Sequence, residues 1–63
     1  MLNDKKIGAL LREKNACNRD LAEAAGVSPN MVTYYRQNKR TPTAGTLAAM
    51  ANFLGCKMDD IWI

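Results

Sequence analysis

The sequence predicts an all-α fold in one domain, with four helices and a final turn or short helix. Ala, Leu and Met are common and β-branched residues are few, a composition that favours helix over strand. Apolar residues recur at helical spacing in four segments. Residues that interrupt helices separate or end these segments, at Asn15, Gly26, Asn38, Pro42 and Gly55.

The length of 63 residues allows a single domain, residues 1–63, with a small core. A hydrophobic share of 48% is enough for a compact helical chain. No apolar run approaches the roughly 18 residues of a membrane span. Residues 1–15 carry charges within their apolar pattern and lack a sequence that resembles a signal-peptide cleavage site. We therefore do not expect a signal peptide. We expect a cytoplasmic protein without membrane association.

The first predicted helix is capped by Asn3 or Asp4 and runs to about Lys14. Its inward stripe consists of Ile7, Leu10 and Leu11, with the stem of Lys14 alongside. Asn15 tolerates the left-handed backbone conformation that ends a helix.

The segment from Asn18 to Tyr35 predicts two short helices joined by a tight turn. The first begins near Cys17 or Asn18, and its apolar face consists of Leu21, Ala22 and Ala25. Gly26 ends it, because glycine takes a positive φ without a Cβ penalty. Ser28 can cap the next helix with its hydroxyl, and Pro29 is tolerated in a first turn. Two helices joined this tightly form a helix-turn-helix, whose second helix can enter the major groove of DNA.

The second helix of this pair runs from Pro29 to about Gln37 and has two different faces. Val32 and Tyr35 should pack inward, with Met31 at the edge of that face. The opposite face carries Asn30, Thr33, Tyr34 and Gln37. Amide groups can bond adenine at two positions, and the hydroxyl-bearing side chains offer contacts to thymine methyl groups. The alternative is a merely solvated surface, but the position in a helix-turn-helix favours base reading.

The net charge of +3 is unevenly distributed along the chain. No Asp or Glu occurs between Ala24 and Met58, where the basic residues are Arg36, Lys39, Arg40 and Lys57. An acid-free basic segment suits a polyanionic partner, although an ordinary solvated surface has the same composition. Lys39 and Arg40 lie in the turn-rich loop 38–43, where they would flank the reading helix and contact phosphate.

The fourth predicted helix is capped by Thr43 and runs to about Leu54, and Gly55 ends it. Its inward residues are Leu47, Met50, Ala51 and Leu54. Residues 58–62 make a final turn or short helix with acids near its N-terminal end. Four apolar residues then remain: Phe53, Ile61, Trp62 and Ile63. They either close the bottom of the core or form a patch for a twofold partner, and the sequence favours neither.

The sequence offers no basis for catalysis, a cofactor or a small-molecule ligand. It contains no His, no metal-ligand cluster, no Gly-rich phosphate loop and no nucleophile–base pattern. The adjacent Asp59 and Asp60 point to different faces and suit the first turn of a helix. Cys17 and Cys56 are too few to hold zinc, and we expect both to be small buried residues rather than a disulfide.

These residues together resemble the Cro/CI-type (lambda-repressor-like, XRE) helix-turn-helix family, and most of all its smallest single-domain members. The resemblance is carried by LAEAAGVS (21–28), Val32 and Tyr35, the KRTP loop (39–42) and TLAAMANFLGCKMDDI (46–61). It implies a compact fold of five α-helices in which the second and third form the DNA-binding unit. It also implies symmetric dimers on two half-sites roughly 34 Å apart.

The resemblance further implies roles for individual residues. The residue at the start of the second helix, Asn18, would bond a phosphate and brace the reading helix. Pro29, Asn30, Thr33 and Tyr34 would face base edges, whereas Ser28, Arg36, Gln37, Lys39 and Arg40 would meet the DNA backbone.

Four positions depart from the family pattern. Asn18 stands where Gln is frequent, Pro29 where a polar base reader is frequent, and Asn38 where Gly is common. Arg36 replaces a common Glu that pairs with an Arg of the first helix. That pair cannot form here, so we expect Arg36 to be free to reach phosphate.

The function that the sequence favours is a sequence-specific DNA-binding transcriptional regulator, a small repressor of a bacterium, phage or mobile element. The alternative is an antirepressor or accessory protein-interaction module that keeps the fold without productive DNA binding. Pro29, the missing Arg–Glu pair and the apolar C-terminus favour this alternative. The acid-free basic segment argues against it.

Overall fold

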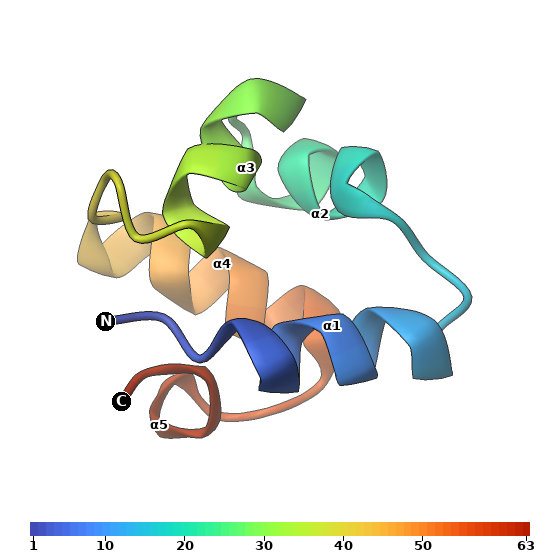
Figure 1. Cartoon of the computed structure of the whole chain (residues 1–63). Coiled ribbons are helices and arrows are strands. Elements are labelled where there is room, and N and C mark those ends of the chain that lie inside the picture. The colour runs from blue at the N-terminus through green and yellow to red at the C-terminus, as the bar shows by residue number, and fades with distance from the viewer.

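Five α-helices make up the structure, a computed structural model that describes all 63 residues (Figure 1). They are α1 (Asp4–Glu13), α2 (Asn18–Ala25), α3 (Pro29–Arg36), α4 (Ala44–Leu54) and α5 (Met58–Ile61). The only extended pairing is an isolated antiparallel bridge between Leu2 and Trp62. The expected helix boundaries agree with the structure to within one residue, and the all-α, five-helix fold is confirmed.

Local side-chain bonds define where the helices begin. The side-chain oxygens of Asn3, Ser28 and Thr43 accept hydrogen bonds from backbone N–H groups one turn into α1, α3 and α4, at 3.2–3.3 Å. The carboxylate of Asp20 reaches back to the backbone N–H of Cys17 at 3.0 Å and so closes the start of α2. Each of these bonds satisfies a donor that the helix itself leaves unpaired.

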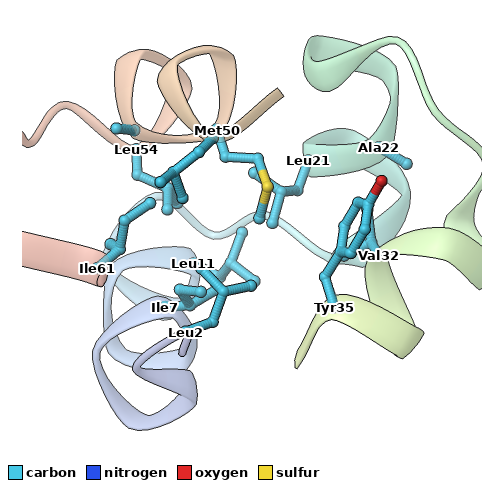
Figure 2. Packing of buried hydrophobic residues seen from close by; sticks show 12 residues of the cluster. Leu2, Ile7, Leu11, Leu21, Ala22, Val32, Tyr35, Met50, Leu54 and Ile61 are labelled. Atoms are coloured by element: carbon cyan, nitrogen blue, oxygen red, sulfur yellow. The ribbon is translucent and has the colours of Figure 1, made fainter. Parts of the chain in front are cut away.

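Apolar side chains from all five helices meet in one core. The buried set is Leu2, Ile7, Leu11, Leu21, Ala22, Val32, Tyr35, Leu47, Met50, Ala51, Leu54 and Ile61. In Figure 2, Met50 reaches from α4 toward Leu21 at the centre of this cluster. α1 packs against α4 and α5, and α2 packs against α3 and α4. The core therefore fixes how the two helices of the helix-turn-helix are set on the rest of the chain.

A ribbon between the chain termini closes the core and was not predicted from the sequence. The backbone N–H of Asn3 donates to Ile61 at 2.8 Å, and that of Ile63 donates to Met1 at 2.7 Å. Figure 1 shows the two termini beside each other. Leu2 lies in this ribbon with its side chain only 2% exposed, so it belongs to the core.

The predicted apolar patch is smaller than expected. Of the two alternatives that the sequence left open, Ile61 takes the first, because it is fully buried in the core and does not belong to a patch. Phe53 is partly buried against the core, and the Lys14 ammonium lies 5.2 Å from the centre of its ring. Trp62 and Ile63 remain exposed and lie next to Met1, which is also exposed.

The prediction that Cys17 is buried is wrong. It precedes the first turn of α2 on the surface, where its thiol donates to the Asp20 carboxylate at 3.5 Å. Cys56 is half-buried, and burial, together with the negative charge of Asp60, raises the pKa of its thiol against the opposing effect of Lys6. Both cysteines are free thiols.

The structure has neither a cluster of metal-ligating side chains nor a membrane-spanning helix. No three or more Cys, Asp or Glu side chains are grouped so that they could hold a metal ion. None of the five helices has the length and apolar character required to span a membrane.

The terminal ribbon predicts a large effect of Leu2 on stability. Leu2→Ala should lower the free energy of unfolding by about 2–4 kcal/mol, because it leaves a cavity under the ribbon. Urea unfolding followed by circular dichroism measures this difference. Ile63→Ala, at a side chain that is 72% exposed, is the matched control and should change stability by less than about 0.5 kcal/mol. Equal effects of the two substitutions would contradict the assignment of Leu2 to the core.

Candidate nucleic-acid interface

The turn between α2 and α3 is short and conformationally fixed. Gly26 has a φ of 73°, in the left-handed region that favours glycine. The backbone N–H of Val27 donates to the carbonyl of Ala22 at 3.0 Å, which completes the exit from α2. Ser28 then caps α3 through the N–H of Met31 at 3.2 Å. Only three residues separate the two helices, so the direction of α3 is set by local geometry.

The core determines which face of α3 is exposed. Val32 is fully buried, Tyr35 is 8% exposed, and Met31 is partly buried against the core. Figure 2 shows Val32 and Tyr35 on the side of α3 that faces α2 and the core. The prediction of the inward face is confirmed, and the opposite face of α3 is held toward solvent.

The solvent face of α3 presents neutral polar groups. Pro29, Asn30 and Tyr34 are exposed, and Thr33 is half-buried. The Thr33 hydroxyl donates to the carbonyl of Pro29 at 3.2 Å, which leaves its methyl group and oxygen lone pairs available. The Asn30 amide has no partner within the chain. Such a face offers an amide, a phenol and apolar atoms to an incoming surface and no charge.

Cationic side chains lie beyond the C-terminal end of α3. Asn38 turns the chain there with a φ of 57°, as predicted. Gln37, Lys39 and Arg40 are exposed, and neither Lys39 nor Arg40 lies within ion-pair distance of a carboxylate. Two unpaired cations therefore flank the exposed face of α3.

Arg36 has a partner, and the expectation that it is free is wrong. Its Nε donates to Oδ1 of Asp4, in the first turn of α1, at 2.5 Å. Its Nη1 donates to Oδ1 of Asn18, at the start of α2, at 2.6 Å. The segment that is acid-free in sequence therefore has a carboxylate beside it in the fold. Sequence reasoning missed Asp4, since nothing local relates two residues that are 32 positions apart.

The same three side chains border a shallow hollow between α1, α2 and α3. Its volume is about 210 Å³, and it is lined by Asp4, Asn18, Thr33, Arg36 and Gln37. Asn18 thus contacts α3 through Arg36.

Asn38 joins the end of the reading helix to the N-terminal segment. Its Oδ1 accepts from the N–H of Leu2 at 2.9 Å, and its Nδ2 approaches the Leu2 carbonyl at 3.4 Å. A glycine at this position could make the turn but neither bond.

Comparison with known proteins decides the family. The sequence profile described as helix-turn-helix matches residues 9–61. The chain belongs to this helix-turn-helix family. In fold it is of the Cro/CI, lambda-repressor-like type.

Two solved structures of this helix-turn-helix type superpose well on the chain. The clp gene regulator ClgR from Corynebacterium glutamicum matches with a TM-score of 0.78 at 24% identity, over 90% of this chain and 61% of that one. The DNA-binding domain of the P22 C2 repressor (1-76) matches with a TM-score of 0.79 at 22% identity, over 94% of this chain and 78% of that one. At these identities the likeness shows the fold. No curated protein gave a significant match.

An ion pair other than the Arg–Glu pair that the resemblance implies links α1 to α3. The acid is Asp4 on α1 and the base is Arg36 on α3. The absence of the usual Arg–Glu pair is therefore not a loss of the link between these two helices.

The two hydrogen bonds of the Asn38 side chain predict that replacing it by glycine lowers stability. The positive φ of Asn38 alone would not predict this loss. Asn38→Gly should lower the free energy of unfolding by about 1 kcal/mol, because two hydrogen bonds to Leu2 are lost. Asn15→Gly is the matched control, since Asn15 also has a positive φ (55°) but no side-chain bond. It should be neutral or slightly stabilising. Thermal unfolding of the two variants measures the difference, and equal stabilities would contradict a role for the Asn38 amide.

Proposed function

We propose that this chain is a sequence-specific transcriptional regulator that reads the major groove of double-stranded DNA with the exposed face of α3. We further propose that it acts as a small repressor in the cytoplasm of a bacterium, or as the repressor of a phage or mobile element. One of its structural neighbours is named as a gene regulator and the other as a repressor, which supports the general class.

The observation that carries this proposal is the division of α3 into two faces. Val32 and Tyr35 are buried, which holds the helix so that Pro29, Asn30, Thr33 and Tyr34 face solvent. An α-helix fits the major groove, where amides and hydroxyls distinguish base pairs by their donor and acceptor patterns. In the proposed complex the Asn30 amide bonds a base edge, while Pro29 and the Thr33 methyl group contact bases through apolar atoms.

The residues around α3 would contact phosphates. Lys39 and Arg40 provide charge at one end of the helix, with Gln37 between them and α3. At the N-terminal end of α3 the proposed phosphate contact comes from Ser28, and Asn18 supplies another one beside Arg36. Arg36 can add to them only weakly, because its charge is already paired with Asp4. Such contacts position the helix and carry no sequence information.

A symmetric homodimer is part of the proposal. Met1, Trp62 and Ile63 are exposed apolar residues of the terminal ribbon, and in the proposal they supply an apolar contact for a second copy. A twofold dimer would place two reading helices on half-sites about one helical turn apart, roughly 34 Å.

Selection of random duplexes by the purified chain at about 150 mM salt, followed by sequencing, tests the proposal. Enrichment of a near-palindrome with half-sites about 10 base pairs apart is expected for a dimer. Enrichment of a single half-site would support sequence-specific binding to DNA and would exclude the proposed dimer. No enrichment would contradict sequence-specific binding.

Two substitutions separate base contacts from phosphate contacts on the duplex recovered by selection. Asn30→Ala should weaken binding by about 1–3 kcal/mol and relax preference at one base position. Arg40→Ala should weaken binding to preferred and random duplexes alike and reduce the dependence of affinity on salt. Fluorescence anisotropy over a range of salt concentrations measures both. Equal losses on both duplexes for Asn30→Ala would count against base reading by this residue.

A protein-interaction module without DNA binding of its own is the second candidate. The exposed Trp62 and Ile63 favour it, because apolar side chains of this size on so small a chain suit a protein partner. It predicts no salt-sensitive affinity for any duplex, together with loss of a partner on Trp62→Ala. Salt-sensitive binding that Trp62→Ala leaves intact would exclude it.

A further inference from the structure

Three polar side chains from three different helices form a connected network next to the reading helix. Arg36 on α3 donates from Nε to Asp4 on α1 and from Nη1 to Asn18 on α2, at 2.5 and 2.6 Å. We call this set, Asp4, Asn18 and Arg36, the Arg36 bridge. Arg36 and Asp4 form the one side-chain ion pair in the chain. All three members of the bridge line the hollow, together with Thr33 and Gln37.

The backbone of α1 leaves room for the bridge. Gly8 lies one turn after Asp4 on α1, on the same side of the helix. A Cβ at this position would lie 3.3 Å from Nη2 of Arg36, closer than an ordinary contact. Glycine at position 8 therefore leaves room beside α1 for the guanidinium of Arg36.

The bridge determines which end of the Asn18 amide is available. A guanidinium can only donate, so the Asn18 amide must turn its oxygen toward Arg36. Its Nδ2 group, which only donates, is then directed away from Arg36. Phosphate oxygens only accept hydrogen bonds, so this is the orientation of Asn18 that suits a DNA backbone.

Asp4 in turn holds the guanidinium in place. Its carboxylate accepts the hydrogen bond from Nε of Arg36, so that Nη1 is positioned to donate to Asn18. The Arg36 side chain is 24% exposed, so without Asp4 it could turn to solvent. The carboxylate of Asp4 would thus act on DNA indirectly, through Arg36 and Asn18.

We propose that Asp4 and Arg36 are positioning residues that orient the Asn18 amide so that it donates to a DNA phosphate. This inference rests on the proposed function and adds to it a residue of α1 that no direct DNA contact requires. It predicts that removing the carboxylate of Asp4 lowers the affinity for DNA. Simple electrostatics says that removing an acid near DNA raises affinity, whereas the loss of this positioning lowers it.

The test measures the affinity of three variants for the duplex recovered by selection. Two of them, Asp4→Asn and Glu13→Gln, have the same net charge. Asp4→Asn should weaken binding by about threefold to tenfold, the effect of one lost hydrogen bond. Asp4→Glu, which keeps the carboxylate, should bind within about twofold of the unaltered chain. Glu13→Gln is the matched control, since it removes one acid from the other end of α1. It should leave the affinity unchanged or raise it.

A double substitution shows whether Asp4 acts through Asn18. In a chain with Asn18→Ala, adding Asp4→Asn should no longer weaken binding, because there is no amide left to orient. Circular dichroism of each variant establishes that it is folded at the assay temperature. Tighter binding by Asp4→Asn, or an equal loss with and without Asn18, would overturn the positioning role alone. Failure of the unaltered chain to bind any duplex would overturn the proposed function and this inference with it.

A measurement without DNA tests the bridge itself. The Nε–H of Arg36 and the amide group of Asn18 give separate side-chain NMR signals. Asp4→Asn should shift both signals and speed the exchange of the Arg36 Nε proton with water. Glu13→Gln should shift neither. Unchanged Arg36 and Asn18 signals in Asp4→Asn would overturn the inference whatever the DNA affinity.

Discussion

Burial in one shared core is the constraint on which the whole structure depends. The longest helix has 11 residues, and helices shorter than about 12–15 residues are marginal in water on their own. Each of the five is therefore helical because its apolar side packs against the others around Met50 and Leu21. The same burial orients α3, since Val32 and Tyr35 are core residues as well as the inner face of the reading helix.

The polar surface follows from this arrangement. Packing of α1 in the same small core leaves its N-terminal end near α3, and there Asp4 meets Arg36. Asn38 makes a second link close to the same C-terminal end of α3, through the backbone of Leu2. Helix α3 is thus held by its buried face, by a side-chain bridge and by an amide contact to the N-terminal segment. The proposed DNA-binding surface combines residues of α2, α3 and the following loop on a support supplied by α1.

Local signals in the sequence predicted most of the fold. Gly26, Asn38 and Gly55 each mark a helix end with a left-handed residue, and the structure has a positive φ at all three. The spacing of Val32 and Tyr35 was enough to separate the inner from the outer face of α3. These signals depend on residues within one or two turns of each other, so a single sequence contains them.

The features that were not predicted depend on contacts between distant residues. Leu2 precedes the first helical segment, so no periodicity marks it as a core residue. The sequence left Ile61 open between the core and an apolar patch, and the ribbon with the N-terminal segment places it in the core. Asp4 was interpreted only as a candidate cap of the first helix, and its contact with Arg36 follows from how α1 and α3 are packed. Cys17 seemed buried by residue type, but helix capping holds it at the surface.

The most direct test of the account is to map the contact surface by NMR. A ¹⁵N-labelled chain would be titrated with the duplex recovered by selection and, separately, with a random duplex of equal length. The account predicts large shifts in the amide signals of Asn30, Thr33 and Tyr34 that differ between the two duplexes. Shifts at Lys39 and Arg40 should be similar for both. Unchanged α3 signals, with shifts concentrated around Trp62 and Ile63, would contradict the claim that α3 reads DNA.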